Sequence, residues 1–154
     1  MQGFLINPKE HLITEIETDG ELHSLYKLLD CHLIDIVVLN DEEDVLYLDD
    51  DGLSRSPTNY FRFGTFPNPL AGKGVILGTD IEGEAISPRT VTLKTLETSV
   101  TFICRETAIS MADAADAAAQ EYIDKTDDGW THIHIPTADI IRSAVYNGEF
   151  EGAE

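Results

Sequence analysis

The stretch PLAGKGVILGTD, residues 69–80, places three glycines and one lysine ahead of an apolar run. A P-loop binds phosphate with a similar pattern, because the backbone amides of G-x-x-x-x-G-K-[ST] surround the phosphate oxygens. Lys73 follows Gly72, but the first glycine position holds Pro67 and the hydroxyl position holds Gly74. The stretch is therefore not a P-loop.

A dinucleotide-binding turn is excluded for a similar reason. That turn needs glycine where Leu77 stands, and it leads from a strand into a helix whose N-terminus binds the pyrophosphate. Here the glycines lead from a loop into a predicted strand. Gly72, Gly74 and Gly78 are better explained by a tight turn and by close approach of the backbone. Lys73 remains a weak candidate for binding an anion.

The acidic and histidine-containing runs do not match a metal site. If the glycine of DDDG, residues 49–52, is aligned with the sixth position of a calcium loop, Tyr47 and Thr58 occupy positions that require carboxylates. His132 and His134 stand two residues apart in a predicted strand, but no third ligand follows at a suitable spacing. We predict no metal site and no cofactor.

Nucleophilic catalysis has no clear support either. The sequence lacks G-x-S-x-G, and Cys31 precedes His32 in a segment where neighbouring side chains point apart. Cys104 has no base beside it in the sequence. Carboxylates are too numerous for any one to be singled out as a general acid. We name no catalytic residue and regard an enzyme as the less supported alternative.

The charge of the chain is its strongest feature. Among 154 residues, 29 are acidic and 10 are basic, which gives a formal net charge of -19. A chain so acidic is expected to repel nucleic-acid backbones and anionic membranes. The acids either adapt the surface to a salt-rich cytoplasm, which screens their repulsion, or imitate DNA and bind a basic partner. Composition leaves both explanations open.

Length and cysteine content limit the class of protein. The chain is long enough for one core, and it has two cysteines, no signal-peptide pattern and no apolar run of membrane-spanning length. We expect a cytoplasmic protein of a host cell with reduced thiols. Association with a virion is the alternative location.

Hydrophobic periodicity predicts an α+β fold with a small, mainly antiparallel sheet built from hairpins and one or two packed helices. Strands flank a turn at 7–9, a helix covers 21–30, and IDIVVLN and DVLYLDD form a hairpin at the centre of the sheet. A further hairpin is predicted with its turn at residues 80–83. Residues 90–103 favour a helix, although their second half also alternates as a strand does.

The segment SRSPTNYFRFGTFPNPL, residues 54–70, has no period and three prolines, which predicts a long loop. Its aromatic residues Tyr60, Phe61, Phe63 and Phe66 have two explanations. They bind a small ligand at an exposed edge, or they cap the core, as large apolar side chains usually do.

Four runs, taken together, resemble a known protein family: LYKLLDC, IDIVVLN, DVLYLDDDGL and NPLAGKGVILGTDIEGEAIS. In this order they resemble the family called Domain of Unknown Function 3846, over roughly residues 2–103. The resemblance implies an accessory protein of a phage, plasmid or host cell, and it brings no known activity. We predict a domain at 1–104 and, at 105–154, an α-rich C-terminal extension with a helix capped by Ser110, a short strand and a last helix.

These observations favour a non-catalytic accessory protein of a virus, plasmid or other mobile element that acts through protein–protein association, with mimicry of DNA against host machinery as one mechanism. The expected partner is a basic, nucleic-acid-binding protein, and oligomers are compatible with the sequence. One alternative is a structural subunit of a virion or complex from a halophilic host, and another is a small-ligand binder that uses Tyr60, Phe61, Phe63 and Lys73. The predicted partner-binding residues are acidic: Asp41, Glu42, Glu43, Asp44, Asp49, Asp50 and Asp51.

Overall fold

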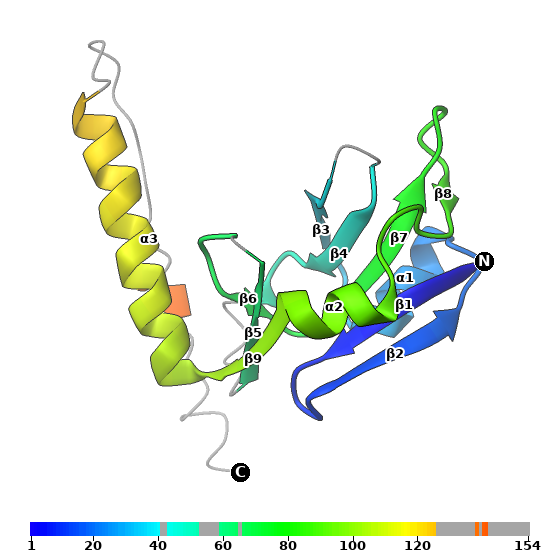
Figure 1. The fold of residues 1–154 in the computed structure, drawn as a ribbon, viewed down its shortest axis with the longest axis horizontal. Coiled ribbons are helices and arrows are strands. Elements are labelled where there is room, and N and C mark those ends of the chain that lie inside the picture. The colour runs from blue at the N-terminus through cyan, green and yellow to red at the C-terminus, as the bar shows by residue number, and fades with distance from the viewer. Residues whose placement is uncertain (41–42, 53–58, 65, 126–137, 139, 142–154) are drawn as a thin grey trace.

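The computed structural model describes residues 1–40, 43–52, 59–64, 66–125, 138 and 140–141. Over these residues the chain forms two antiparallel sheets and three helices, so the predicted α+β class is confirmed (Figure 1). The predicted strand and helix of 126–154 lie outside this part of the chain, apart from three helical positions.

The larger sheet has the strand order β2-β1-β7-β4-β3, with β8 beside β7. The smaller sheet has the order β6-β5-β9. The strands are β1 (Gln2–Asn7), β2 (Leu12–Glu17), β3 (Ile34–Val38), β4 (Val45–Asp49), β5 (Asn59–Phe63), β6 (Leu70–Ala71), β7 (Gly74–Thr79), β8 (Ala85–Ile86) and β9 (Val100–Cys104). The helices are α1 (Leu22–Leu29), α2 (Leu93–Ser99) and α3 (Arg105–Lys125).

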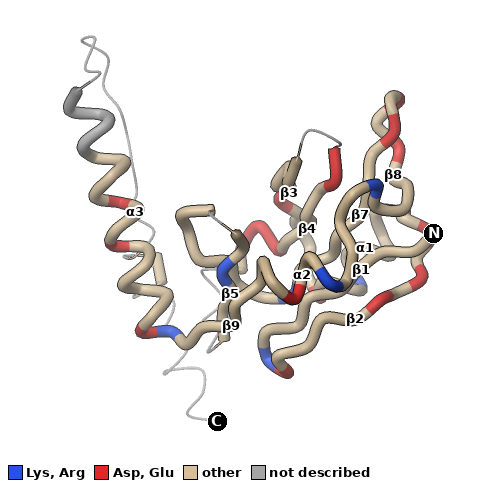
Figure 2. The backbone as a smooth tube through the Cα atoms, viewed as in Figure 1, with Lys and Arg blue, Asp and Glu red and all other residues tan. Residues whose placement is uncertain are grey.

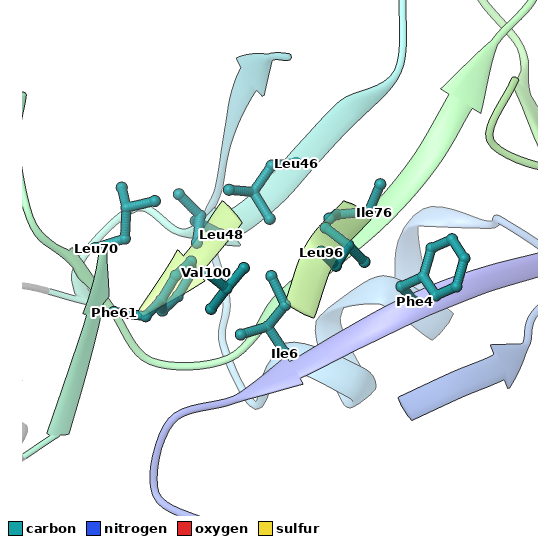
Figure 3. Packing of buried hydrophobic residues seen from close by; sticks show 9 residues of the cluster. All are labelled: Phe4, Ile6, Leu46, Leu48, Phe61, Leu70, Ile76, Leu96 and Val100. Atoms are coloured by element: carbon teal, nitrogen blue, oxygen red, sulfur yellow. The ribbon is translucent and has the colours of Figure 1, made fainter. Parts of the chain in front are cut away.

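The elements stack in layers around the larger sheet. On one face, Leu25 and Leu29 of α1 pack against Val75 and Leu77 of β7. On the other face, α2 and the smaller sheet enclose a core that Figure 3 shows in close-up. Its buried members are Phe4, Ile6, Leu46, Leu48, Phe61, Leu70, Ile76, Leu96 and Val100. Because β7 is covered on both faces, it is apolar along most of its length, as a central strand must be.

Helix α3 covers the remaining face of the smaller sheet. Its Ala108 and Ala112 are buried against Tyr60 of β5, and the cluster also contains Ala138 and Ile141. Alanines at these positions allow a helix to approach a sheet closely. The helix begins directly after β9, so Ser110 lies inside it and is not the predicted cap.

Residues 90–103 contain both of the elements that their sequence pattern allows. A capping box between Thr92 and Thr95 starts α2, with N–H···Oγ1 distances of 2.9 and 3.2 Å. The chain then extends into β9, which pairs with β5 along its whole length. The prediction of a helix throughout was wrong for β9, because pairing with a distant strand decides its conformation.

The glycines of residues 69–80 have the structural role that their sequence predicts. Gly72 has a φ of 79°, a left-handed conformation that favours glycine. A Cβ at Gly74 would lie 2.8 Å from Cδ1 of Leu46, and one at Gly78 would lie 2.6 Å from the carbonyl oxygen of Ser87. These glycines therefore permit the turn into β7 and close contacts along it.

Asp44 is buried, with 0% of its surface exposed, so its predicted place on an exposed acidic face was wrong. Its carboxylate accepts the backbone N–H groups of Arg89, Thr90 and Val91 at 2.7–2.9 Å and the side-chain amide of Asn40 at 3.2 Å. Burial raises the pKa of this carboxyl, but these donors outweigh burial and hold the pKa below its ordinary value. Asp44 thus ties the β3–β4 hairpin to the segment that leads into α2.

Replacing Asp44 with asparagine should lower the free energy of unfolding by about 2 kcal/mol, because an amide nitrogen would face buried N–H donors. The folded-state pKa lies below the unfolded value, so the stabilisation by Asp44 is present above the unfolded pKa and lost as pH falls through the folded pKa. Urea unfolding between neutral and acidic pH measures both effects. The exposed Asp50→Asn should change stability by less than about 0.5 kcal/mol, and equal losses in the two variants would contradict this role.

Candidate functional surface

The predicted acidic residues do not form one continuous face. Glu43 is exposed at the tip of the β3–β4 hairpin, whereas Asp50 and Asp51 are exposed beyond the other end of β4. A strand of this length separates them by roughly 17 Å. Asp49 is half-buried, and its carboxylate accepts the N–H of Asp51 at 2.9 Å. Asp41 and Glu42 lie outside the described residues.

The predicted ligand-binding residues are also divided. Tyr60 and Phe61 are fully buried in β5, so the prediction that they bind a ligand at an exposed edge was wrong, and the alternative of core packing is correct for them. Lys73 is half-buried between β6 and β7. Phe63 is half-buried and, with Phe66, lines a groove beside the β3–β4 hairpin. Residues 59–63, which were predicted to be part of a loop, form strand β5 because they pair with β9 and β6.

This first groove, which we call the Phe63 groove, has a volume of about 410 Å³. It lies between β3 and the segment that connects β5 to β6. Apart from Gly64, its walls are apolar side chains and Pro67: Val37, Val38, Leu39, Leu46, Phe63, Phe66 and Leu70. The groove therefore suits apolar groups of a ligand or of a partner protein.

A second groove of about 380 Å³, which we call the Ile81 groove, lies on the other face of β3. Ile36 is 54% exposed, Val38 64% and Ile81 97%, so this groove brings three exposed apolar side chains together. The lining residues are Ile36, Val38, Glu43, Val45, Tyr47, Thr79, Asp80, Ile81 and Gly83. No lysine or arginine is among them, so the charges of this groove are negative.

A tight turn holds Ile81 out from the sheet. The carboxylate of Asp80 accepts the N–H groups of Glu82 and Glu84 at 2.9 Å each, and the N–H of Gly83 bonds to the carbonyl of Asp80 at 3.0 Å. Ile81 at its tip is therefore presented to solvent, while Asp80 and Thr79 form the groove wall.

Strand β3, which separates the two grooves, is an edge of the larger sheet (Figure 1). We predicted that this hairpin would form the centre of the sheet, and this was wrong for β3. The centre belongs to β7, because β7 is apolar on both faces whereas β3 carries exposed residues on both. The exposed side chains of Ile36 and Val38 are candidate binding residues that the sequence analysis missed, because their pattern is that of an ordinary strand.

The hydrogen bonds that flank β3 show which of its backbone groups face outward. Leu39 donates its N–H to the carbonyl of Asp44 at 2.8 Å, and the carbonyl of Leu33 accepts the N–H of Asp50 at 3.0 Å. Since antiparallel pairing alternates, the odd-numbered residues face β4 and the even-numbered residues face away from the sheet. The outward backbone groups are therefore those of Ile34, Ile36 and Val38.

The described residues contain no cluster of metal-ligating side chains. Among them, no three His, Cys, Asp or Glu side chains lie together as metal ligands would. Cys104 is exposed at the end of β9, directly before α3, where a hydrogen bond with the hydroxyl of Thr107 and nearby backbone N–H groups lower its pKa. Cys31 is buried under α1.

Within the described part of the chain, no helix combines the length and the apolar character needed to cross a bilayer.

Comparison with known proteins places the larger sheet and the first two helices in a family. A model described as "Domain of unknown function (DUF3846)" matches residues 1–100. The chain is also 32% identical over 104 residues to "Uncharacterized protein y4iR" of Sinorhizobium fredii (strain NBRC 101917 / NGR234). That alignment covers 66% of this chain and 62% of the relative, so the chain matches less than two thirds of the relative's length. No solved structure matches. The chain belongs to the DUF3846 family.

Proposed function

We propose that this protein is a non-catalytic accessory protein that binds a basic partner protein through the Ile81 groove. One observation carries the proposal: exposed Ile36, Val38 and Ile81 lie beside acidic side chains and no basic ones. Exposed apolar groups that are rimmed by polar residues are typical of protein interfaces. The Ile81 groove thus combines exposed apolar side chains with negative charge.

The two kinds of residue have different physical roles in such an interface. Burial of the isoleucine and valine side chains supplies affinity, at about 25 cal/mol for each Å² removed from water. Glu43 and Asp80 supply charge complementarity, which increases the association rate of a positively charged protein and disfavours acidic partners. The net charge of -19 extends this attraction beyond the contact itself.

A DNA-binding protein of a host cell is the partner class that this proposal favours. Such proteins carry basic surfaces shaped for a polyanion, and an acidic protein competes with DNA for them. The resemblance to this family implies an accessory protein of a phage, plasmid or host cell, and it supports a role against host machinery in the host cytoplasm. The partner would then be held through its DNA-binding face.

The proposal predicts release of a host protein from immobilised DNA. Host DNA-binding proteins are loaded on DNA-cellulose and eluted with increasing concentrations of this protein. Glu43→Gln combined with Asp80→Asn should raise the concentration needed for release about tenfold, because two rim charges are lost while an amide oxygen can still accept the turn hydrogen bonds of Asp80. The control, Glu15→Gln with Glu97→Gln, removes two exposed acids elsewhere and should elute like the wild type. Equal effects of the two pairs, or no release at all, would count against the proposal.

A second candidate is a structural subunit from a salt-loving host, and the distribution of acids favours it. Figure 2 shows Asp and Glu on β2, near the β7–β8 turn and on α3 as well as near the β3–β4 hairpin. Acids spread over many elements suit solvation in concentrated salt.

Unfolding in potassium chloride separates the two candidates. The partner-binding proposal predicts a cooperative native state at low salt, since the fold does not need screening of its charges. Salt adaptation predicts a native state that exists only near molar salt, because the self-repulsion is then screened. Thermal unfolding followed by circular dichroism over a potassium chloride series gives the answer, and a requirement for molar salt would favour the structural subunit.

A further inference from the structure

We infer that the partner binds as an added β-strand along β3, with alternate side chains entering the Phe63 groove and the Ile81 groove. The inference rests on the proposed function and specifies the partner: an extended segment in which apolar residues alternate with lysine or arginine. Strand addition to a sheet edge is a general mode of peptide recognition, in which backbone hydrogen bonds give affinity and flanking pockets give specificity.

The backbone of β3 has the groups that strand addition needs. The N–H and C=O groups of Ile34, Ile36 and Val38 face away from β4, as the hydrogen bonds at both ends of the strand require. The N–H of Ile36 is bonded to the side chain of the adjacent Asp35 at 2.9 Å. Within the described part of the chain, the outward N–H groups of Ile34 and Val38 form no hydrogen bond. Two donors and three carbonyls are therefore open to a partner strand.

The two edges of the larger sheet differ in how they are protected. Edge strands usually avoid pairing by carrying charges or by being covered. Strand β2, at the other edge, presents the exposed acids Glu15 and Glu17. Strand β3 has Asp35 as its single charged residue and exposes the apolar side chains of Ile36 and Val38. An exposed apolar edge of this kind favours pairing.

The grooves determine the side chains of the added strand. Successive residues of a strand point to opposite faces, so one set enters the Phe63 groove and the other enters the Ile81 groove. The Phe63 groove is apolar and suits valine, isoleucine or leucine. In the Ile81 groove, the aliphatic part of a lysine or arginine packs on Val38 and Ile81 while its charge approaches Glu43 and Asp80. The charge of the grooves thus selects an alternating basic and apolar segment.

Charge also argues against a second copy of this chain at the same edge. Pairing of β3 with β3 would bring two copies of Glu43, Asp80 and Asp35 close together, and each copy carries a net charge of -19. Like charges that face each other across an interface oppose association. A basic segment has no such penalty.

The test uses a fluorescent peptide of about nine residues in which lysine and valine alternate, with a scrambled peptide of the same composition as control. Val38→Pro removes one outward N–H and leaves the β3–β4 ladder intact, because proline is tolerated at such edge positions. Val38→Thr is the matched variant, since it is β-branched and keeps the N–H. We expect Val38→Pro to weaken binding about tenfold and Val38→Thr no more than about threefold.

Residue-level amide exchange of the full chain, with and without the peptide, gives a second readout that does not depend on a variant folding. Strand addition predicts slower exchange of the Ile34 and Val38 amides when the alternating peptide is bound. Similar binding of the scrambled peptide, equal affinity of the two Val38 variants, or unchanged exchange at these amides would overturn the inference. Failure of wild-type protein to bind the alternating peptide would also overturn it.

These failures are distinguishable from failure of the proposed function. If Glu43→Gln with Asp80→Asn weakens peptide binding but Val38→Pro does not, an acidic binding surface remains and strand addition is wrong. Release of host proteins from DNA-cellulose tests the proposed function without the peptide. A dimer in sedimentation experiments that Val38→Pro converts to a monomer would show that the occupant is a second copy, which contradicts a basic partner.

Discussion

The arrangement of the molecule depends on one buried carboxylate. Asp44 receives the backbone N–H groups of Arg89, Thr90 and Val91, and these residues are more than forty positions away in the sequence. The charge is stable in the interior because several donors compensate for its desolvation. This contact fixes the end of the β3–β4 hairpin against the segment that begins α2, and α2 in turn covers the core. An acid that the composition suggested would be on the surface is thus a structural element.

The position of the hairpin explains the surface that we propose as functional. Strand β4 pairs with β7 on one side and β3 on the other, and no further described strand pairs with β3, so β3 is an edge whose two faces border different grooves. The groove beside Phe63 is apolar because the β5–β6 segment packs against the core. The groove beside Ile81 is acidic because the hairpin tip and the β7–β8 turn contribute Glu43 and Asp80. One strand thereby separates two chemically different surfaces, which suits a partner strand whose side chains alternate.

Local patterns in the sequence were sufficient for features that depend on neighbouring residues. They predicted the β1–β2, β3–β4 and β7–β8 hairpins, α1, and the structural role of the glycines around Gly74. They failed where distant pairing decides the outcome: the strand β5, the strand β9, and the edge position of β3. The acidic surface was predicted only in part, since burial of Asp44 depends on donors contributed by another segment. Exposure of Ile36 and Val38 depends on strand order, which periodicity does not encode.

The most direct test of the central claim is residue-level amide exchange of the isolated protein, because the inferred strand addition requires β3 to be an open edge. The account predicts rapid exchange for Ile34 and Val38, slow exchange for Val37 and Leu39, whose N–H groups face β4, and slow exchange for Thr90 and Val91, which bond to Asp44. Slow exchange at Ile34 and Val38 in the isolated chain would show that the edge is already covered. That result would contradict the partner strand that we infer along β3.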